Sequence, residues 1–223
     1  MSANWIDYLK SVDTPTLANA IELLELRPRH EGFTPLSIRC VFPEFGRMAG
    51  YAVTAHAETM TKTGPLDLGQ FMDLYKLVEA SPKPAVVVIQ EIGGQRDHAV
   101  HCGEVMATIF GRLGAVGLVS DCAVRDLQEV RALGFQYFAR GVAASHGHFR
   151  IVRTGVPVQI EGLAIHPGDL LHGDENGLLH IPAGIEGTLP AKVEAVRSRE
   201  GRLMQYVRSP QFRLEELHGK MVE

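Results

Sequence analysis

The sequence predicts an α/β protein with a parallel βαβ core, a β-rich second half and a C-terminal helix. Three observations carry this prediction. Apolar runs at 84–92 and 115–121 alternate with helical patterns at 103–114 and 123–134, as in parallel strands joined by crossover helices. Beyond about residue 145, short apolar pairs alternate with Pro-Gly and Asn-Gly turns, which are typical of antiparallel β-structure. Residues 183–208 form a charged helical segment.

The elements of the first half follow from caps and periodicity. A helix is expected over 12–26, because Asp13 or Thr14 can cap it and Pro15 suits its first turn. Its apolar residues fall on one face: Leu17, Ala20, Ile21 and Leu24. A strand over 47–59 and an amphipathic helix over 67–80 follow. The run at 84–92 is continuously apolar, as expected for a strand that is covered on both faces.

The second half repeats the alternation before its character changes. Gly114 is a suitable stop for the helix over 103–114. A further strand is expected over 135–141, and β-structure closed by tight turns over 156–182. The helix over 183–208 needs a surface to pack on, which another subunit could supply.

Length and composition indicate one soluble globular domain over 1–223. Hydrophobic residues make up 45% and charged residues 22% of the chain, without repeats or low-complexity segments. The net charge is -4 and Lys and Arg are scattered along the chain, so we do not expect it to bind nucleic acid. Neither a signal peptide nor a membrane span is expected. Three cysteines without CxxC spacing (Cys40, Cys102 and Cys122) favour reduced thiols and a cytoplasmic location.

Charged residues gather in "GLVSDCAVRD" at 117–126. Asp121 ends the apolar run, and Arg125 and Asp126 are expected in the first turn of the next helix. Glu104 opens the preceding helix. Ligands of parallel α/β units gather where strands end and the following helices begin. If the strands 84–92 and 115–121 are neighbours, Glu104 and the 121–126 turn share one crevice.

This group of side chains has a specific chemical capacity. A guanidinium grips a carboxylate with two parallel hydrogen bonds, while carboxylate oxygens hold a hard divalent cation. Free N–H groups at the helix that begins near Gly103 can receive a second anionic oxygen. Together these groups would stabilise an enolate. The alternative is structural: Asp126 as a helix cap and Arg125–Asp126 as a surface ion pair.

A longer pattern resembles the RraA-like family. Glu104 is followed by twenty residues, then Arg125-Asp126, two residues and Glu129. This matches the family's motif of an acid, twenty residues, Arg-Asp, two residues and another acid. Further matches are "GFQYFARG" at 134–141 and "PGDLLHGDENGLLHIP" at 167–182. The family includes divalent-metal-dependent 4-hydroxy-4-methyl-2-oxoglutarate and 4-carboxy-4-hydroxy-2-oxoadipate aldolases.

The resemblance implies a site and an activity. Asp126 would hold Mg²⁺ or Mn²⁺, Arg125 would bind pyruvate, and Glu104 would bind metal-coordinated water. Backbone N–H groups of the 102–105 loop (Cys102, Gly103, Glu104 and Val105) would receive the pyruvyl oxygens. The implied reaction is cleavage of a 4-hydroxy-2-oxo acid to pyruvate through an enolate, with a metal-bound water as base and oxaloacetate decarboxylation as a side activity.

The resemblance also implies a swivelling β/β/α architecture and a homotrimer or homohexamer. A C-terminal glutamate of the adjacent subunit would approach the metal-bound water; Glu200 is the first candidate and Glu194 the second. Two departures bear on the substrate. Cys122 stands where the family usually has glycine, which would strain the turn or narrow the pocket if that glycine uses a positive φ. The loop "RDHAVH" at 96–101 is bulkier and more charged than the family pattern.

Other functions and sites stay open at this stage. A protein-binding regulator of ribonuclease activity, without catalysis, is one alternative; a related 2-oxo acid decarboxylase or hydratase is another. His98 and His101 have a spacing that could serve zinc, but loop or supporting histidines explain them as well. Cys102 and Cys122 are expected to be buried side chains rather than nucleophiles. "GDENG" at 173–177 is expected to be a hairpin turn rather than a calcium loop.

Overall fold

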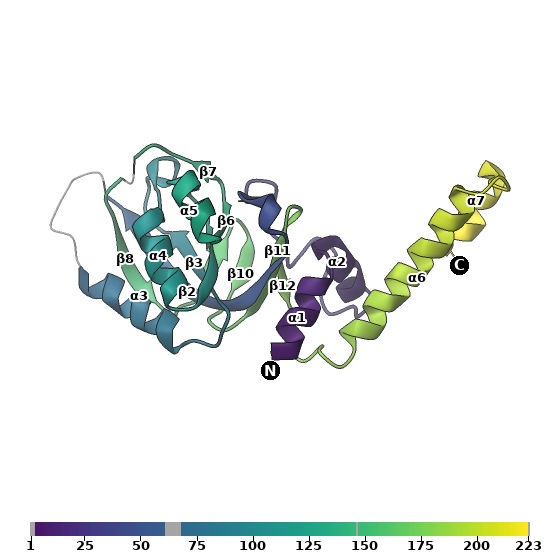
Figure 1. Cartoon of the computed structure of the whole chain (residues 1–223), viewed down its shortest axis with the longest axis horizontal. Helices are drawn as coiled ribbons and strands as arrows, with labels where there is room; N and C mark the ends of the chain where they lie inside the picture. The colour runs from purple at the N-terminus through teal and green to yellow at the C-terminus, as the bar shows by residue number, and fades with distance from the viewer. Residues whose placement is uncertain (1–2, 61–67, 146, 223) are drawn as a thin grey trace. The chain divides into compact units, whose positions relative to one another are not determined.

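The structure is a computed structural model that describes residues 3–60, 68–145 and 147–222 (Figure 1). The chain forms two compact units. The first comprises Met1–Thr14 and His30–Ala183, and the second comprises Pro15–Arg29 and Gly184–Glu223. No helix in the described part of the chain is long and apolar enough to cross a membrane.

The described residues alternate between helices and strands as the sequence predicts. The α-helices are α1 (Ala3–Ser11), α2 (Thr14–Glu22), α3 (Leu68–Ala80), α4 (Glu104–Arg112), α5 (Leu127–Leu133), α6 (Leu189–Val207) and α7 (Leu214–Val222). The 3-10 turns are η1 (Pro43–Phe45) and η2 (Arg96–His98). The strands are β1 (Arg39–Cys40), β2 (Met48–Thr59), β3 (Ala85–Glu91), β4 (Ala115–Ser120), β5 (Ala123–Val124), β6 (Gln136–Ala139), β7 (Gly141–Val142), β8 (Phe149–Thr154), β9 (Val158–Ile160), β10 (Leu163–Ile165), β11 (Leu170–Asp174) and β12 (Gly177–Ile181).

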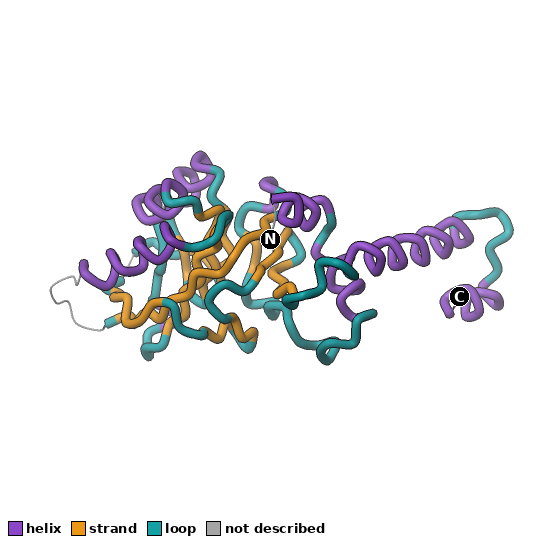
Figure 2. The backbone as a smooth tube through the Cα atoms, turned by 90° about the horizontal axis from the view of Figure 1, so that it is seen from below, coloured by secondary structure: helices purple, strands orange, loops and turns teal. Residues whose placement is uncertain are grey.

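The first unit is organised by a mixed sheet in the order β1-β6-β4-β3-β2-β11-β12 (Figure 2, strands in orange). Strands β2, β3, β4 and β6 are parallel to one another, which confirms the predicted βαβ core. Because β2 has twelve residues, it pairs antiparallel with β11 through its first half and with β8 through its second. Antiparallel β-structure after residue 145 is therefore also confirmed.

Both faces of the parallel strands are covered. Along β3, Val87 and Ile89 join the core that contains Leu74 of α3 and Phe110 of α4. Figure 1 shows α3, α4 and α5 together on this side of the sheet. Val86 and Val88, which point the other way, join a second core with the β9–β10 hairpin. The alternation along one strand explains why 84–92 is apolar at consecutive positions.

Several predicted boundaries were wrong. The helix expected over 123–134 begins only at Leu127, since Ala123 and Val124 pair with β7 and Asp126 adopts a left-handed backbone conformation. The helix expected over 12–26 ends at Glu22, and the C-terminal helix expected from 183 begins at Leu189. Helices α1 and α7 were not predicted at all.

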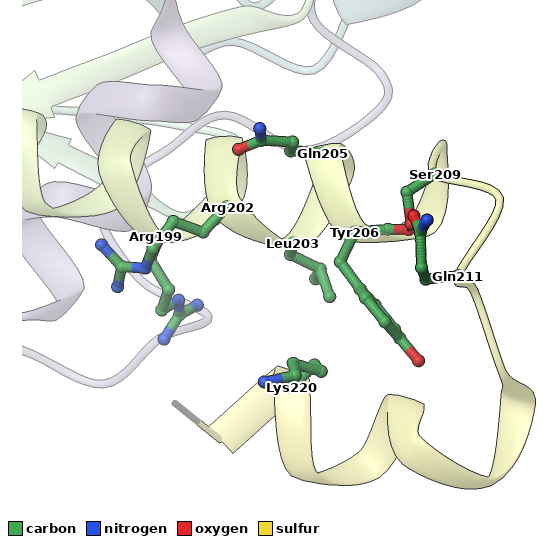
Figure 3. Close-up of a pocket in the computed structure, with 8 residues that line it drawn as sticks. All are labelled: Arg199, Arg202, Leu203, Gln205, Tyr206, Ser209, Gln211 and Lys220. Atoms are coloured by element: carbon green, nitrogen blue, oxygen red, sulfur yellow. The ribbon is translucent and has the colours of Figure 1, made fainter.

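The second unit is helical. Most of its buried apolar residues come from α2 and α6 (Leu17, Ala20, Ile21, Leu189, Val193 and Val196), and Ile185 precedes α6. Tyr206 joins α6 to the start of α7, because its hydroxyl accepts the amide of Arg213 at 3.0 Å and lies 3.0 Å from Glu216 Oε2, to which it can donate. Figure 3 shows this tyrosine reaching from α6 toward the second helix.

Candidate functional site

The start of α4 and the turn before α5 come together in the first unit. The backbone amide of Glu104 donates a hydrogen bond of 2.9 Å to Asp126 Oδ2. The amide of Arg125 donates to Cys102 O at 3.0 Å, and Val100 forms a parallel bridge with Ala123. Strands β3 and β4, which lead into these two loops, are neighbours. The structure therefore brings the start of α4 next to Arg125 and Asp126, the second part of the 121–126 turn.

Gly103 makes this approach possible. A Cβ atom at residue 103 would lie 2.4 Å from Asp126 Oδ2 and 2.9 Å from Arg125 Nε, which is closer than real Cβ contacts allow. The backbone of Gly103 is itself extended, with φ -136° and ψ -169°. Glycine thus leaves the space above its Cα in which Arg125 and Asp126 lie, and a larger residue would force these two side chains to shift. An unusual backbone angle does not explain the glycine.

Asp126 is held in a strained backbone conformation. Its φ of 57° and ψ of 47° are left-handed, and it caps the N-terminus of α5 through its backbone. Aspartate and asparagine tolerate this conformation better than other non-glycine residues, and such strain gathers at functional sites. The prediction that Arg125 and Asp126 fall in the first helical turn was wrong, because α5 begins at Leu127, and Asp126, the residue that caps it, is left-handed.

The charged groups of this crevice are partly open to solvent. Arg125 Nε lies 3.4 Å from Asp126 Oδ2, and the two side chains are 34% and 30% exposed. Glu104 and Glu129, at the starts of α4 and α5, are exposed. Asp126 and Glu104 present carboxylate oxygens, the donor type that Mg²⁺ and Mn²⁺ prefer. This donor set fits the divalent cation that the sequence resemblance implies.

A cavity of about 410 Å³ lies in the second unit between α6 and α7. Arg199 and Arg202 line it from α6 and Lys220 lines it from α7 (Figure 3). None of the residues that the sequence singled out as site candidates lines it. A cavity of about 570 Å³ in the first unit does contain such residues, because Cys102, Gly103, Val105 and Arg125 line it. The 570 Å³ cavity of the first unit is therefore the one that lies beside the Arg125–Asp126 turn.

Asp121 belongs to a separate, buried polar network. Its Oδ1 accepts the backbone amide of Glu91 at 2.8 Å, and its Oδ2 pairs with Arg96 Nη2 at 3.0 Å. Burial raises the pKa of Asp121, against the hydrogen bond from Glu91 and the charge of Arg96. Asp121 thus supports the loop at 96–101 rather than sharing the contacts of Arg125 and Asp126.

Glu91 and His101 form the centre of this network. His101 Nε2 lies 3.1 Å from Glu91 Oε2, and His101 Nδ1 lies 2.9 Å from Ser120 Oγ. Glu91 also accepts the amide and hydroxyl of Thr59 and the amide of Gly93. Burial alone would raise the pKa of Glu91, but the hydrogen bonds from His101 and Thr59 outweigh it and lower the pKa.

Glu91, His101 and Cys122 also bring ligand-type atoms within 4.8 Å of one another. The protein already satisfies both oxygens of Glu91 and both ring nitrogens of His101, so a hydrogen-bond network explains the cluster without an ion. His98, at the end of η2, is exposed while His101 is buried. The two histidines therefore do not form the pair that their spacing suggested.

The cysteines lack the features of nucleophiles. All three are free thiols. Burial raises the pKa of Cys102 to about 12 and raises that of Cys122 as well. Cys122 has no positive φ and does not line the 570 Å³ cavity. The glycine of the family pattern is thus not required here by the backbone, and the cysteine does not narrow that cavity.

Two further sequence expectations can be located. The segment "GDENG" is the turn between β11 and β12, in which Asp174 Oδ1 accepts the amide of Asn176, so the hairpin prediction is confirmed. Glu200 and Glu194 are exposed on α6. Glu200 Oε1 accepts a hydrogen bond of 3.3 Å from Asn19, and Glu194 Oε1 accepts one of 3.3 Å from Ser198.

Sequence comparison finds relatives of this chain. It is 34% identical over 122 residues to a protein of Halalkalibacterium halodurans named "Putative 4-hydroxy-4-methyl-2-oxoglutarate aldolase", covering 54% of this chain and 57% of that protein. It is 30% identical over 141 residues to Protein DlpA of Legionella pneumophila, covering 62% of this chain and 23% of that protein. The chain therefore spans less than two thirds of the length of either relative.

Solved structures share the fold. Streptomyces coelicolor RraAS2, described as an unusual member of the RNase ES inhibitor RraA protein family, has a TM-score of 0.69 at 20% identity, over 90% of this chain and 96% of that one. An uncharacterised protein from Pseudomonas syringae has a TM-score of 0.74 at 23% identity, over 98% and 94%. The family model described as "Aldolase/RraA" matches residues 14–179, and the chain therefore belongs to the RraA-like family.

Proposed function

We propose that this chain is a divalent-metal-dependent lyase that cleaves a 4-hydroxy-2-oxo acid to pyruvate. The observation that carries this proposal is the close approach of the Arg125 and Asp126 side chains to the Cα of Gly103. The carboxylate of Asp126 also accepts a hydrogen bond from the amide of Glu104. A cap and a surface ion pair would not need a glycine under both side chains. The name of the Halalkalibacterium halodurans relative supports the same reaction class.

Asp126 would hold Mg²⁺ or Mn²⁺ directly, and Glu104 would bind it through water. Such a cation polarises a carbonyl oxygen and lowers the pKa of a bound water. The strained backbone of Asp126 and its bond to the Glu104 amide fix the direction of the carboxylate. We expect this fixed orientation of the Asp126 carboxylate to favour metal binding, because a ligand held by a neighbouring hydrogen bond is already in place before the cation binds.

Arg125 would bind the carboxylate of the substrate. Among the described residues, Arg125 Nε lies 3.4 Å from Asp126 Oδ2, and we assign its two terminal amino groups to a bidentate pair with the substrate's carboxylate. The amide of Glu104 is used by Asp126. Of the backbone groups at 102–105, the amides of Gly103 and Val105 are then the ones that we assign to the substrate's oxygens, because the first N–H groups of a helix have no partner within it.

The reaction balances with these groups. The 4-hydroxyl loses its proton through a bound water to the Glu104 carboxylate, and the C3–C4 bond breaks to give a carbonyl product. The electron pair of that bond enters the pyruvyl part as an enolate, whose negative oxygen is stabilised by fixed donors. A proton returned to C3 completes pyruvate. Oxaloacetate gives the same enolate on losing carbon dioxide, so we expect it to be decarboxylated.

Assembly and location are proposed on the family resemblance. We propose a homotrimer or homohexamer in which Glu200, or failing that Glu194, of a neighbouring subunit approaches the metal site. A single domain over 1–223, a cytoplasmic location and the absence of nucleic-acid and membrane partners complete the proposal. A binding protein that regulates a ribonuclease is the competing function, since the family also contains inhibitors.

The testing experiment is a pyruvate-release assay. The purified chain is incubated with 4-hydroxy-2-oxo acids and oxaloacetate, with Mg²⁺ or Mn²⁺, and again with excess chelator. We expect turnover that the chelator abolishes and that added metal restores. The proposal would be contradicted if the folded protein turned over none of these compounds and showed no detectable Mn²⁺ binding. That result would favour the ribonuclease regulator.

A further inference from the structure

The cavity beside Arg125 has an unusual wall for a site that acts on small anions. Its volume is about 570 Å³, within the range of pockets that enclose drug-sized molecules. Pyruvate alone would occupy a small part of it. Helix α3 contributes Phe71, Met72 and Tyr75, and helix α4 contributes Met106 and Ile109. The space next to the predicted catalytic turn is therefore large and bounded by apolar side chains.

Charge in this cavity is concentrated at one end. Arg125 and Gly103 line it where α4 begins, and Arg125 is the one permanently charged side chain among its described lining residues. Away from Arg125, the polar side chains among the described lining residues are Tyr75 and His148. A second carboxylate placed along α3 and α4 would lie against thioether, aromatic and alkyl groups. Burying an anion without a partner is costly, whereas burying an apolar group there is favourable.

The aromatic residues of the cavity wall are fixed by packing against the core. Phe71 packs edge-on against Phe149 with ring centroids 5.4 Å apart, and Tyr75 packs edge-on against Phe110 at 5.5 Å. These contacts tie the lining of the cavity to the buried core of α3, α4 and the sheet. Aromatic edges and faces offer favourable contacts to another ring. Met72 is half exposed, so it borders the cavity without being part of the core.

We propose that the substrate is a 2-oxo acid with a bulky apolar substituent, an aryl or branched alkyl group on C4, which occupies this cavity while Arg125 holds the carboxylate. This inference rests on the proposed function for the identity of the anionic end. It adds the substrate class, and it assigns to Phe71, Met72, Tyr75, Met106 and Ile109 a role in specificity.

Binding and turnover test the inference separately. Two 2-oxo acids that lack the 4-hydroxyl, and so cannot be cleaved, are compared by calorimetry with Mn²⁺ present: 2-oxo-4-phenylbutanoate and 2-oxoglutarate. We expect the phenyl compound to bind at least about tenfold more tightly, as is usual when an apolar pocket is filled. In the pyruvate assay, 4-hydroxy-2-oxo-4-phenylbutanoate should likewise exceed 4-hydroxy-4-methyl-2-oxoglutarate in kcat/KM.

A charge placed in the wall provides the matched variant. Met72→Lys should reduce the preference for the phenyl compound about tenfold or more, because the lysine opposes the apolar group and can pair with a second carboxylate. Leu36→Lys is the control, since Leu36 is 91% exposed and does not line the cavity. It should leave both affinities unchanged.

The outcomes separate the two proposals. If the dicarboxylic acids bind and are cleaved while the phenyl compounds are not, the lyase assignment stands and the apolar specificity is overturned. The same holds if Met72→Lys leaves the preference unaltered. If neither 2-oxo acid binds in the presence of Mn²⁺, the proposed function fails, and the inference that rests on it fails with it.

Discussion

The backbone amide of Glu104 and the carboxylate of Asp126 are joined by a hydrogen bond of 2.9 Å. Twenty-one residues separate the two positions along the chain. Parallel pairing of β3 and β4 brings the loops that carry them together, and Gly103 leaves the space in which they meet.

Gly103→Ala should displace Arg125 and Asp126 while leaving the fold intact. The extended backbone of Gly103 accepts alanine, but the new Cβ would lie 2.4 Å from Asp126 Oδ2. Misplacing catalytic groups by about 1 Å costs on the order of 100-fold in rate. Pyruvate release should fall by that order, with an unchanged circular dichroism spectrum.

Gly201→Ala is the matched control, because nothing lies within 4 Å of a Cβ at that position of α6. It should keep full activity and gain about 0.5–1 kcal/mol in the free energy of unfolding. Equal activity of both alanine variants would mean that the seating of Arg125 and Asp126 does not matter.

Cys122→Gly should keep or raise activity. The thiol is buried, lies 3.7 Å from Asp121 Oδ1 and does not line the cavity beside Arg125. Its loss should lower the free energy of unfolding by about 1–2 kcal/mol, through a small void and a more flexible backbone. Urea unfolding and the pyruvate assay measure the two effects. Complete loss of activity in a folded variant would make Cys122 a functional residue and remove the aldolase assignment.

His172 should make stability depend on pH between 6.5 and about 4. Burial lowers its pKa from 6.5 to about 4, and it is held neutral between Thr14 Oγ1 at 3.0 Å and Leu9 O at 3.1 Å. The unfolded chain takes up the proton first as the pH falls. The stabilisation is therefore present above pH 6.5 and lost toward pH 4, by up to about 3 kcal/mol.

Urea unfolding at pH 7 and pH 5 tests this. The difference in the free energy of unfolding between the two pH values should shrink in His172→Gln, whatever the variant's absolute stability. His30→Gln is the control, because the His30 side chain is 84% exposed. An identical pH difference in the parent and in His172→Gln would show that His172 does not titrate in this way.

The proposed assembly has its own test. Light scattering should give three or six times the chain mass of 24.4 kDa at micromolar concentration. Glu200→Gln should lower turnover without changing this mass, whereas Glu194→Gln, on the same helix, should change turnover less. A stable particle of 24.4 kDa would count against both the assembly and Glu200 as a site residue.

The sequence predicted most of the sheet and missed parts of the helices. Continuous apolar runs predicted β3 and β4, and Pro-Gly and Asn-Gly turns predicted the hairpins, because covered parallel strands and tight turns have local signatures. Helix α1 also has a local signal in Trp5, Ile6 and Leu9, which are buried, but it was not identified. The early start expected for α5 could not be corrected from the sequence, since nothing local reveals that Asp126 turns left-handed.

The candidate site divides in the same way. The expectation that Glu104 lies near Arg125 and Asp126 followed from the predicted parallel strands, because the loops after two neighbouring strands lie at the same edge of the sheet. The role of Gly103 as a seat, and the grouping of Asp121 with Arg96 rather than with Arg125, arise from side-chain packing that spacing does not encode. The apolar cavity combines α3 and α4, so only the tertiary structure reveals it.

Arg125 and Asp126 are adjacent and should fail differently when changed. Asp126→Asn keeps the size of the side chain and tolerates the left-handed backbone, but it removes the charge that would hold a cation. Its Mn²⁺ affinity should fall steeply, with partial recovery of turnover at high Mn²⁺. Arg125→Lys keeps the charge but loses the bidentate pair, so its Mn²⁺ affinity should hardly change. Its turnover should fall, because about 2–4 kcal/mol of transition-state stabilisation is lost.

Titration of Mn²⁺ into these two variants, with pyruvate release measured in parallel, tests the central claim most directly. The account predicts weak metal binding in Asp126→Asn, and near-normal metal binding with poor turnover in Arg125→Lys. If both variants bind Mn²⁺ and release pyruvate like the parent, Arg125–Asp126 is a surface ion pair at a helix cap, worth about 0–1 kcal/mol. That result would contradict the proposed enzyme.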